Sequence, residues 1–140
     1  VPVPNRTTVS GKPLMDLVNQ GQISQSKLDE IIDRTRKGGA EVVKLLEVGS
    51  AFYGPAASGI EMADSYLNNK KKTLPCAAYL NGEYGVSDLY VGVPVIIGSG
   101  GIEQVVELDL DPEEKKHFDT SIEAVNELFD AAKNIDPSLK

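Results

Sequence analysis

The fold class follows from residues 73–110, which read TLPCAAYLNGEYGVSDLYVGVPVIIGSGGIEQVVELDL. Residues 73–80 and 88–97 are rich in side chains that favour strands, and the turn sequences Asn-Gly and Gly-Ser-Gly-Gly follow them. Residues 102–110 alternate apolar and polar side chains, which is typical of a third strand. Three consecutive strands with short links predict an antiparallel meander. Its middle strand, 88–97, is apolar enough to predict burial on both faces.

A long amphipathic helix is predicted directly after the meander. Asp111 is a good N-cap, Pro112 fits the first helical position, and Glu114 completes a capping box. Apolar side chains then recur at helical spacing over about twenty residues. They are Phe118, Ile122, Val125, Phe129 and Ala132. We expect this face to lie on the sheet and the chain from Ile135 onward to fray.

The chain is predicted to start in an extended conformation. Pro2 and Pro4 disfavour helix before them, so residues 1–12 are expected to be extended, with a turn at residues 11–13. A short helix is expected over residues 13–18.

A longer helix is predicted to begin after Ser24, which is a favourable N-cap. Gly38 and Gly39 interrupt its apolar pattern, and each glycine costs about 1 kcal/mol in a helix interior. We therefore expect a kinked or a two-piece helix that ends near Leu46.

A third helix is predicted over residues 55–67. Its expected buried stripe consists mostly of small side chains, which would let another helix approach closely, either within the chain or across a subunit boundary. The stripe comprises Ala56, Gly59, Ile60, Ala63 and Leu67.

These elements predict an α+β fold, in which helices are followed by a three-stranded antiparallel meander and a long C-terminal amphipathic helix. The length of 140 residues corresponds to a single domain. The net charge of −7 argues against a nucleic-acid partner. The longest apolar runs are too short for a membrane span, so we expect a soluble, cytoplasmic protein. One cysteine and one histidine cannot build a disulfide or a common zinc site.

The sequence shows no catalytic constellation. His117 precedes the core-facing Phe118 in a charged helical run, and we interpret it as solvated rather than as a general base. Cys76 follows a proline within a predicted strand, with no histidine nearby in sequence, and is interpreted as an inert thiol rather than a nucleophile.

Three charged or glycine-rich segments also receive structural interpretations. Residues 98–101 precede a strand rather than a helix, so we expect a hairpin turn and not a phosphate-binding loop. An acidic cluster around residues 109–114 is explained by capping and solvation rather than by a metal site. Residues 70–72 are three lysines, which we expect to be a solvated connector.

The segment of residues 49–55 is different. It concentrates small residues and two aromatics, Phe52 and Tyr53, between two predicted helices. This composition suits either the lining of a pocket or simple helix packing, and the residues alone leave both open.

Several segments together resemble the C-terminal domain of the lactate/malate dehydrogenase family. They are DRTRKGGAEVV at 33–43, GSAFYGPAAS at 49–58, LPCAAY at 74–79, GEYGV at 82–86, YVGVP at 90–94, IIG at 96–98 and GIE at 101–103. The resemblance covers nearly the whole chain and is closest to the lactate-dehydrogenase-like malate dehydrogenases.

This resemblance implies a two-part enzyme. The family couples an N-terminal Rossmann domain that binds NAD to a substrate domain, and its reaction uses a histidine in a Gly-His-Gly-Asp motif, an aspartate and substrate-binding arginines. Val1-Pro2-Val3-Pro4 resembles the stretch that follows the histidine motif. We therefore expect residues 1–140 to be a truncated substrate domain that lacks the Rossmann domain and every catalytic residue, and we do not assign catalysis to His117.

What carries over is a wall of the pocket. The resemblance implies that Gly39, Ala51 and Pro55 face the nicotinamide and the substrate. Many lactate dehydrogenases have threonine at the position of Ala51 and lack Pro55, so alanine and proline favour the malate branch. Lactate dehydrogenases that derive from that branch also carry the proline and stay an alternative.

The leading hypothesis is thus a C-terminal piece of an NAD-dependent malate dehydrogenase, which interconverts malate and oxaloacetate and is inactive alone. The alternatives are a lactate dehydrogenase acting on lactate and pyruvate, and a non-catalytic assembly module. In each case we expect a homo-oligomer, a dimer or a tetramer, that buries the helix at residues 56–67, and no metal site.

Overall fold

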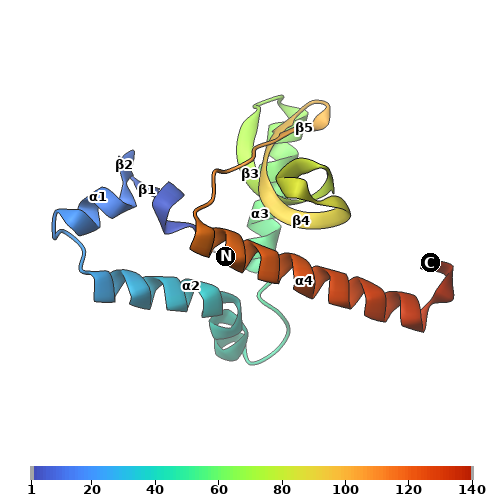
Figure 1. The fold of residues 1–140 in the computed structure, drawn as a ribbon, viewed down its shortest axis with the longest axis horizontal. Coiled ribbons are helices and arrows are strands. Elements are labelled where there is room, and N and C mark those ends of the chain that lie inside the picture. The colour runs from blue at the N-terminus through green and yellow to red at the C-terminus, as the bar shows by residue number, and fades with distance from the viewer. Residues whose placement is uncertain (1, 140) are drawn as a thin grey trace. The chain divides into compact units, whose positions relative to one another are not determined.

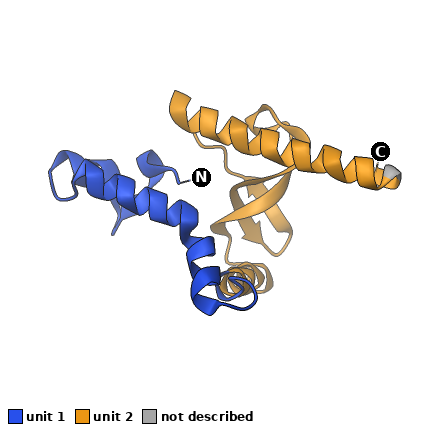
Figure 2. Cartoon of the chain, turned by 90° about the horizontal axis from the view of Figure 1, so that it is seen from below, with its two compact units in different colours: residues 1–54 blue, residues 55–140 orange. Residues whose placement is uncertain are grey.

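The computed structural model describes residues 2–139, so Val1, the first residue of the predicted extended start, lies outside the described part. The chain forms two compact units, residues 1–54 and 55–140 (Figure 2). The helical elements are η1 (Pro4–Arg6), α1 (Leu14–Asn19), α2 (Gln25–Leu46), α3 (Tyr53–Leu67), η2 (Glu83–Gly85), α4 (Pro112–Ile135) and η3 (Pro137–Leu139) (Figure 1). The strands are β1 (Thr8–Val9), β2 (Lys12–Pro13), β3 (Lys72–Asn81), β4 (Ser87–Gly98) and β5 (Gly101–Val105).

The first unit departs from the predicted extended start. Pro4 opens the 3-10 turn η1, because proline fixes its own φ near about −65° and disfavours helix only in the residue before it. β1 and β2 form a small antiparallel hairpin. Its turn lies at Ser10 and Gly11, with φ values of 50° and 79°, and not at residues 11–13 as predicted. Both positive values suit a two-residue hairpin turn.

Helices α1 and α2 follow the sequence prediction more closely. The Ser24 side chain accepts a hydrogen bond from the Lys27 backbone N–H at 3.2 Å, which confirms the predicted N-cap. α2 is one continuous helix to Leu46, so the two-piece alternative is wrong. Its ribbon nevertheless changes direction along its length (Figures 1 and 2). The kinked alternative is the one that the structure supports.

The second unit is built on the predicted meander, with strand order β3-β4-β5 and antiparallel pairing throughout. Alternate β4 side chains, Leu89, Val91, Val93, Val95 and Ile97, are buried. The intervening Tyr90 and Gly92 are exposed. The predicted burial of the middle strand on both faces is therefore wrong: successive side chains point to opposite faces, and only one face is covered within this unit.

Helices α3 and α4 supply the cover. Met62 of α3 and Phe118, Ile122 and Val125 of α4 pack against the buried face of the sheet. Ser65 of α3 is fully buried, and its hydroxyl donates to the Ile97 carbonyl at 2.7 Å and accepts from the Lys72 backbone N–H at 3.2 Å. α3 is thus joined to two strands by one side chain.

The predicted stripe of α3 is not the buried face in this chain. Ile60 and Leu67 are 70% and 75% exposed, and the small residues of the stripe are exposed with them. Helical periodicity identified an apolar face, but the residues that contact the sheet, Met62 and Ser65, lie on another. The stripe has no cover within the second unit.

The third strand is shorter than predicted, because β5 ends at Val105. Beyond it, the Tyr84 hydroxyl donates to the Val106 carbonyl at 2.8 Å and accepts from the Leu108 N–H at 2.9 Å. A side chain therefore holds backbone groups that a longer strand would pair with another strand.

The C-terminal helix has the predicted start. Asp111 Oδ1 accepts hydrogen bonds from the backbone N–H groups of Glu113 and Glu114 at 2.9 Å each, and Glu114 Oε2 accepts from the Asp111 N–H at 3.1 Å. The capping box is complete. Among residues 2–139, no helix is long and apolar enough to cross a membrane.

Candidate functional site

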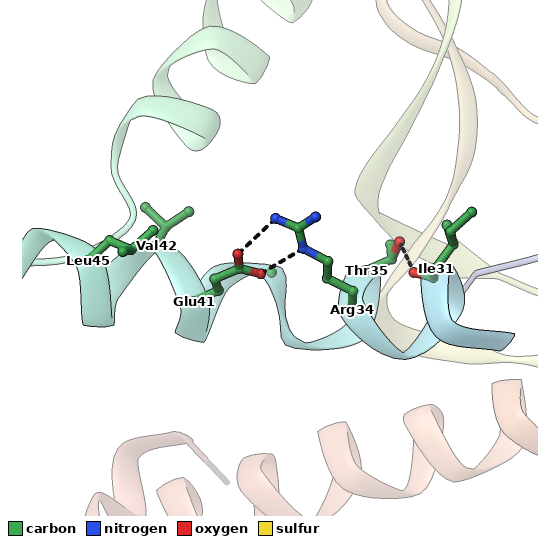
Figure 3. A pocket seen from close by; sticks show the side chains of 7 residues that line it. Ile31, Arg34, Thr35, Glu41, Val42 and Leu45 are labelled. Carbon is green, nitrogen blue, oxygen red and sulfur yellow. Dashed lines mark hydrogen bonds and ion pairs between the residues drawn. The ribbon is translucent and has the colours of Figure 1, made fainter. Parts of the chain in front are cut away.

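The first unit contains a groove along one face of α2. Its lining residues recur at helical spacing, so they share that face. They are Ile31, Arg34, Thr35, Gly38, Glu41, Val42 and Leu45 (Figure 3). The wall is largely apolar, and Ile31, Val42 and Leu45 are 46%, 40% and 76% exposed. An apolar face that stays this exposed needs a further surface to cover it.

An ion pair crosses this face. Arg34 Nε and Nη2 donate to the two carboxylate oxygens of Glu41 at 3.1 and 2.9 Å, which is bidentate geometry (Figure 3). The hydrogen bond to Glu41, and then its charge, raises the pKa of Arg34. The same hydrogen bond, followed by the charge of Arg34, lowers the pKa of Glu41. Both groups are held in their charged forms. Sequence analysis missed this pair, because a spacing of seven residues lies outside the usual i, i+3 and i, i+4 pairs.

The loop between α2 and α3 is the second component. Glu47, the C-cap of α2, is in the left-handed conformation with φ 60°, and Gly49 follows with φ 87°. Phe52 and Tyr53 pack on each other with ring centroids 4.6 Å apart, yet they are 50% and 69% exposed. Val48 is 82% exposed. Packing within the first unit therefore leaves these three side chains exposed, and a role in lining a pocket stays a prediction.

The three predicted pocket residues lie on consecutive segments. Gly39 is exposed within α2, next to the groove-lining Gly38, and Ala51 is half-buried in the loop. Pro55 is exposed in the first turn of α3. Gly39 and Ala51 belong to the first unit and Pro55 opens the second. Their role as a pocket wall stays a prediction.

His117 and Cys76, which we interpreted as structural residues, lie in surroundings that agree with that interpretation. His117 is exposed on α4. Cys76 is half-buried, its Sγ lies 3.3 Å from Met62 Sδ, and burial raises the pKa of its thiol, which keeps the thiol protonated. Within residues 2–139, no group of three or more His, Cys, Asp or Glu side chains could hold a metal ion.

The glycine-rich turn at residues 98–101 links β4 to β5, as predicted. The Ser99 N–H donates to Asn69 Oδ1 at 3.0 Å, and the Gly100 N–H points to Glu103 Oε1 at 3.4 Å. The Glu103 carboxylate lies so close to Gly98 that a Cβ there would overlap it. A carboxylate thus occupies the place that an anionic phosphate would need, and the turn does not fit a dinucleotide.

The lysine run is more than a solvated connector. Lys70 pairs with Asp64, Lys71 with Glu103 at 3.3 Å, and Lys72 with Glu61. Lys70 and Lys71 are exposed in the connection between α3 and β3, as predicted, and the ion pairs with acidic side chains of α3 and β5 are an addition that the sequence did not indicate.

A comparison with protein families finds one model that matches residues 1–135, described as the lactate/malate dehydrogenase, alpha/beta C-terminal domain. Among curated relatives, the malate dehydrogenase of Pelagibacter ubique is 62% identical over 139 residues, which are 99% of this chain and 43% of that protein. The chain therefore spans less than half the length of this relative.

Solved structures similar to this chain are also malate and lactate dehydrogenases, and the chain again covers less than half of each. The malate dehydrogenase of Cryptosporidium parvum is 47% identical, with a TM-score of 0.91, over 95% of this chain and 42% of that one. The lactate dehydrogenase of Eimeria maxima, solved with NADH and oxamate, is 43% identical, with a TM-score of 0.93, over 97% of this chain and 42% of that one. Both activities occur among the similar proteins.

Proposed function

The chain belongs to the lactate/malate dehydrogenase family, and from this premise we propose that it is the substrate domain of an NAD-dependent malate dehydrogenase. In this role it works with a Rossmann half that binds NAD and supplies the catalytic histidine, its aspartate and the arginines that hold substrate carboxylates. The observation that carries the proposal is the 62% identity to a malate dehydrogenase over nearly the whole chain.

NAD binding belongs to the other half in this proposal. The glycine-rich turn of this chain does not fit the cofactor, since Asn69 and Glu103 take its N–H groups and its space. When bound there, NADH would supply the hydride that reduces the keto carbon of oxaloacetate and would leave as NAD. The residues of this chain contribute shape in this proposal: Gly39, Ala51 and Pro55 form the pocket wall, and the Rossmann half covers the exposed apolar face of α2. A closed wall excludes water and orients the substrate.

A lactate dehydrogenase is the second candidate. The Eimeria maxima enzyme has the higher TM-score of the two structures compared above, although its sequence identity is lower. The two candidates differ in whether the keto acid carries a second carboxylate.

The test uses two hybrid proteins, each of which joins this chain to one NAD-binding half. The first hybrid takes that half from the Pelagibacter ubique malate dehydrogenase, and the second takes it from the Eimeria maxima lactate dehydrogenase. NADH oxidation is measured with oxaloacetate and with pyruvate. We expect the first hybrid with oxaloacetate to have the higher kcat/KM. A more active second hybrid with pyruvate would identify the lactate enzyme, and no turnover by either hybrid would refute both candidates.

A matched pair of variants tests the pocket wall. Ala51→Phe should lower kcat/KM of the active hybrid by about a hundredfold, because displacing the substrate by an ångström costs about that much. Glu123→Phe adds the same ring at an exposed position of α4, outside the proposed wall, and it should leave turnover unchanged. Equal effects would remove Ala51 from the wall.

The exposed stripe of α3 supports an oligomer of the whole protein. Ile60 and Leu67 are 70% and 75% exposed on a helix face whose small residues allow close approach. Ile60→Lys should therefore lower the mass found by light scattering for the active hybrid. A hybrid that is monomeric without the substitution would contradict this assignment.

A further inference from the structure

The glycine pair of α2 is not explained by lack of space. A Cβ built at Gly38 or Gly39 would meet no heavy atom within 4 Å. Both glycines lie inside a continuous helix, where each costs about 1 kcal/mol relative to alanine. What glycine adds at such a position is backbone freedom. The pair is therefore a compliant point within α2, at which the helix can change direction.

The Arg34–Glu41 ion pair spans this point. Arg34 lies four residues before Gly38 and Glu41 two residues after Gly39, so the bidentate contact joins the two halves of the helix. Seven residues rise by about 10.5 Å, or nearly two turns. Only two long side chains that reach toward each other can bridge that distance, and Figure 3 shows them doing so along the groove.

The other ion pairs of α2 do not span the two glycines. Lys37 pairs with Asp33 at 2.8 Å, and Lys27 pairs with Glu30 at 2.9 Å. Each joins neighbouring turns before the glycines and cannot restrain the part of the helix beyond them. Bidentate geometry is also the case in which an exposed pair contributes measurably.

We propose that Arg34 and Glu41 form a brace across Gly38 and Gly39, which holds the C-terminal half of α2 and the loop that carries Ala51 in one direction. They are positioning residues, since they act on the pocket through the helix rather than through the substrate. The brace itself depends on the geometry of the first unit alone, and its effect on the pocket rests on the proposed function.

A distance measurement in this chain tests the brace. Spin labels are attached to cysteines introduced at the exposed Ser26 and Ser50, in a Cys76→Ser background, and the distribution of distances between them is recorded. We expect one dominant distance. Glu41→Gln should lower the ratio of the dominant conformer to all others by about two- to five-fold, the range expected for losing one surface ion pair.

Two controls define the result. Asp33→Asn removes the ion pair that lies before the glycines and should leave the distribution unchanged. The double variant Arg34→Glu with Glu41→Arg reverses the pair and should restore the dominant distance. An unchanged distribution in Glu41→Gln, an equal change in Asp33→Asn, or no recovery in the reversed pair would each overturn the brace.

Kinetics of the active hybrid test its effect on the pocket. If only the braced conformer binds substrate, the apparent Kd equals the intrinsic Kd divided by the fraction of braced conformer, so losing the brace weakens apparent binding. Glu41→Gln should then raise KM by the factor by which the measured fraction of the dominant conformer falls, which is less than about two-fold while that conformer keeps more than half of the population. It should leave kcat unchanged, and Asp33→Asn should change neither. A lowered kcat at constant KM would contradict the positioning role. An inactive parent hybrid would refute the proposed function instead, and the distance measurement would still decide the brace.

Discussion

Ser65→Ala should destabilise the second unit far more than the loss of one hydroxyl suggests. The hydroxyl of this fully buried serine holds the Ile97 carbonyl and the Lys72 N–H, at 2.7 and 3.2 Å. Alanine leaves the carbonyl of the buried Ile97 without this donor, which costs about 1–3 kcal/mol. The Lys72 N–H is only half-buried, and its loss adds about 0.5–1 kcal/mol because water can replace the hydroxyl.

The net effect follows from these values and from helix propensity. Alanine is the better helix former by about 0.5 kcal/mol, which offsets part of the loss. We therefore expect a decrease of about 2–3 kcal/mol in the free energy of unfolding. For a unit of this size the decrease corresponds to a fall in Tm of about 10–20 °C.

Thermal unfolding followed by circular dichroism measures the difference, and Thr120→Ala is the matched control. The Thr120 hydroxyl is exposed and donates to the Lys116 carbonyl of its own helix at 3.0 Å. Its loss should change stability by less than about 0.5 kcal/mol. A loss below about 1 kcal/mol for Ser65→Ala, or equal losses for the two variants, would refute the tie between α3 and the sheet.

Three further predictions concern the helices. Asp111→Ala removes the N-cap and half of the capping box of α4 and should lower the free energy of unfolding by about 1 kcal/mol, measured by urea denaturation. The control Glu123→Ala, at an exposed site on the same helix, should leave the free energy of unfolding unchanged. Gly38→Ala should raise the stability of α2 by about 1 kcal/mol, seen as slower amide exchange, and faster exchange would show that the glycine is needed for another reason. Hydrogen bonds from Lys70 and Asn68 lower the pKa of Asp64 in the folded state. The Asp64 carboxylate therefore stabilises the fold at a pH above its pKa in the unfolded chain, and this stabilisation is lost as the pH falls through its lower pKa in the folded chain. Asp64→Asn should flatten the acid limb of the stability profile, and an unchanged limb would contradict this.

Helix starts and strand pairings that depend on residues near one another in the sequence could be predicted. The caps at Ser24 and Asp111 and the three strands of the meander follow from local chemistry, and the structure confirms them. The helix capped by Asp111 also packs its predicted face on the sheet, through Phe118, Ile122 and Val125.

What failed depends on contacts between distant segments. β5 ends at Val105, and although the Val106 N–H still donates to the Pro94 carbonyl, the Val106 carbonyl and the Leu108 N–H are bonded by the Tyr84 hydroxyl, more than twenty residues away. α3 uses Met62 and Ser65 against the sheet, although its apolar stripe suggested another face. Periodicity shows that a helix has an apolar face but does not show which surface will cover it.

One part of the candidate site could be predicted from the sequence, and another part could not. The composition of residues 49–55 indicated a segment with more than a linking role, and the exposure of Phe52 and Tyr53 agrees with that interpretation. The Arg34–Glu41 contact needed coordinates, because a spacing of seven residues bridges the glycine pair only when both side chains extend along the groove.

The most direct test of the account compares this chain before and after it is joined to an NAD-binding half. The proposal assigns the catalytic histidine, the carboxylate-binding arginines and the cofactor site to the other half, so the purified chain, mixed with NADH and oxaloacetate, should leave NADH absorbance unchanged. The same chain joined to the Pelagibacter ubique half should oxidise NADH. Turnover by the chain alone, or none by the joined protein, would contradict the assignment of this chain as the substrate domain of a two-part dehydrogenase.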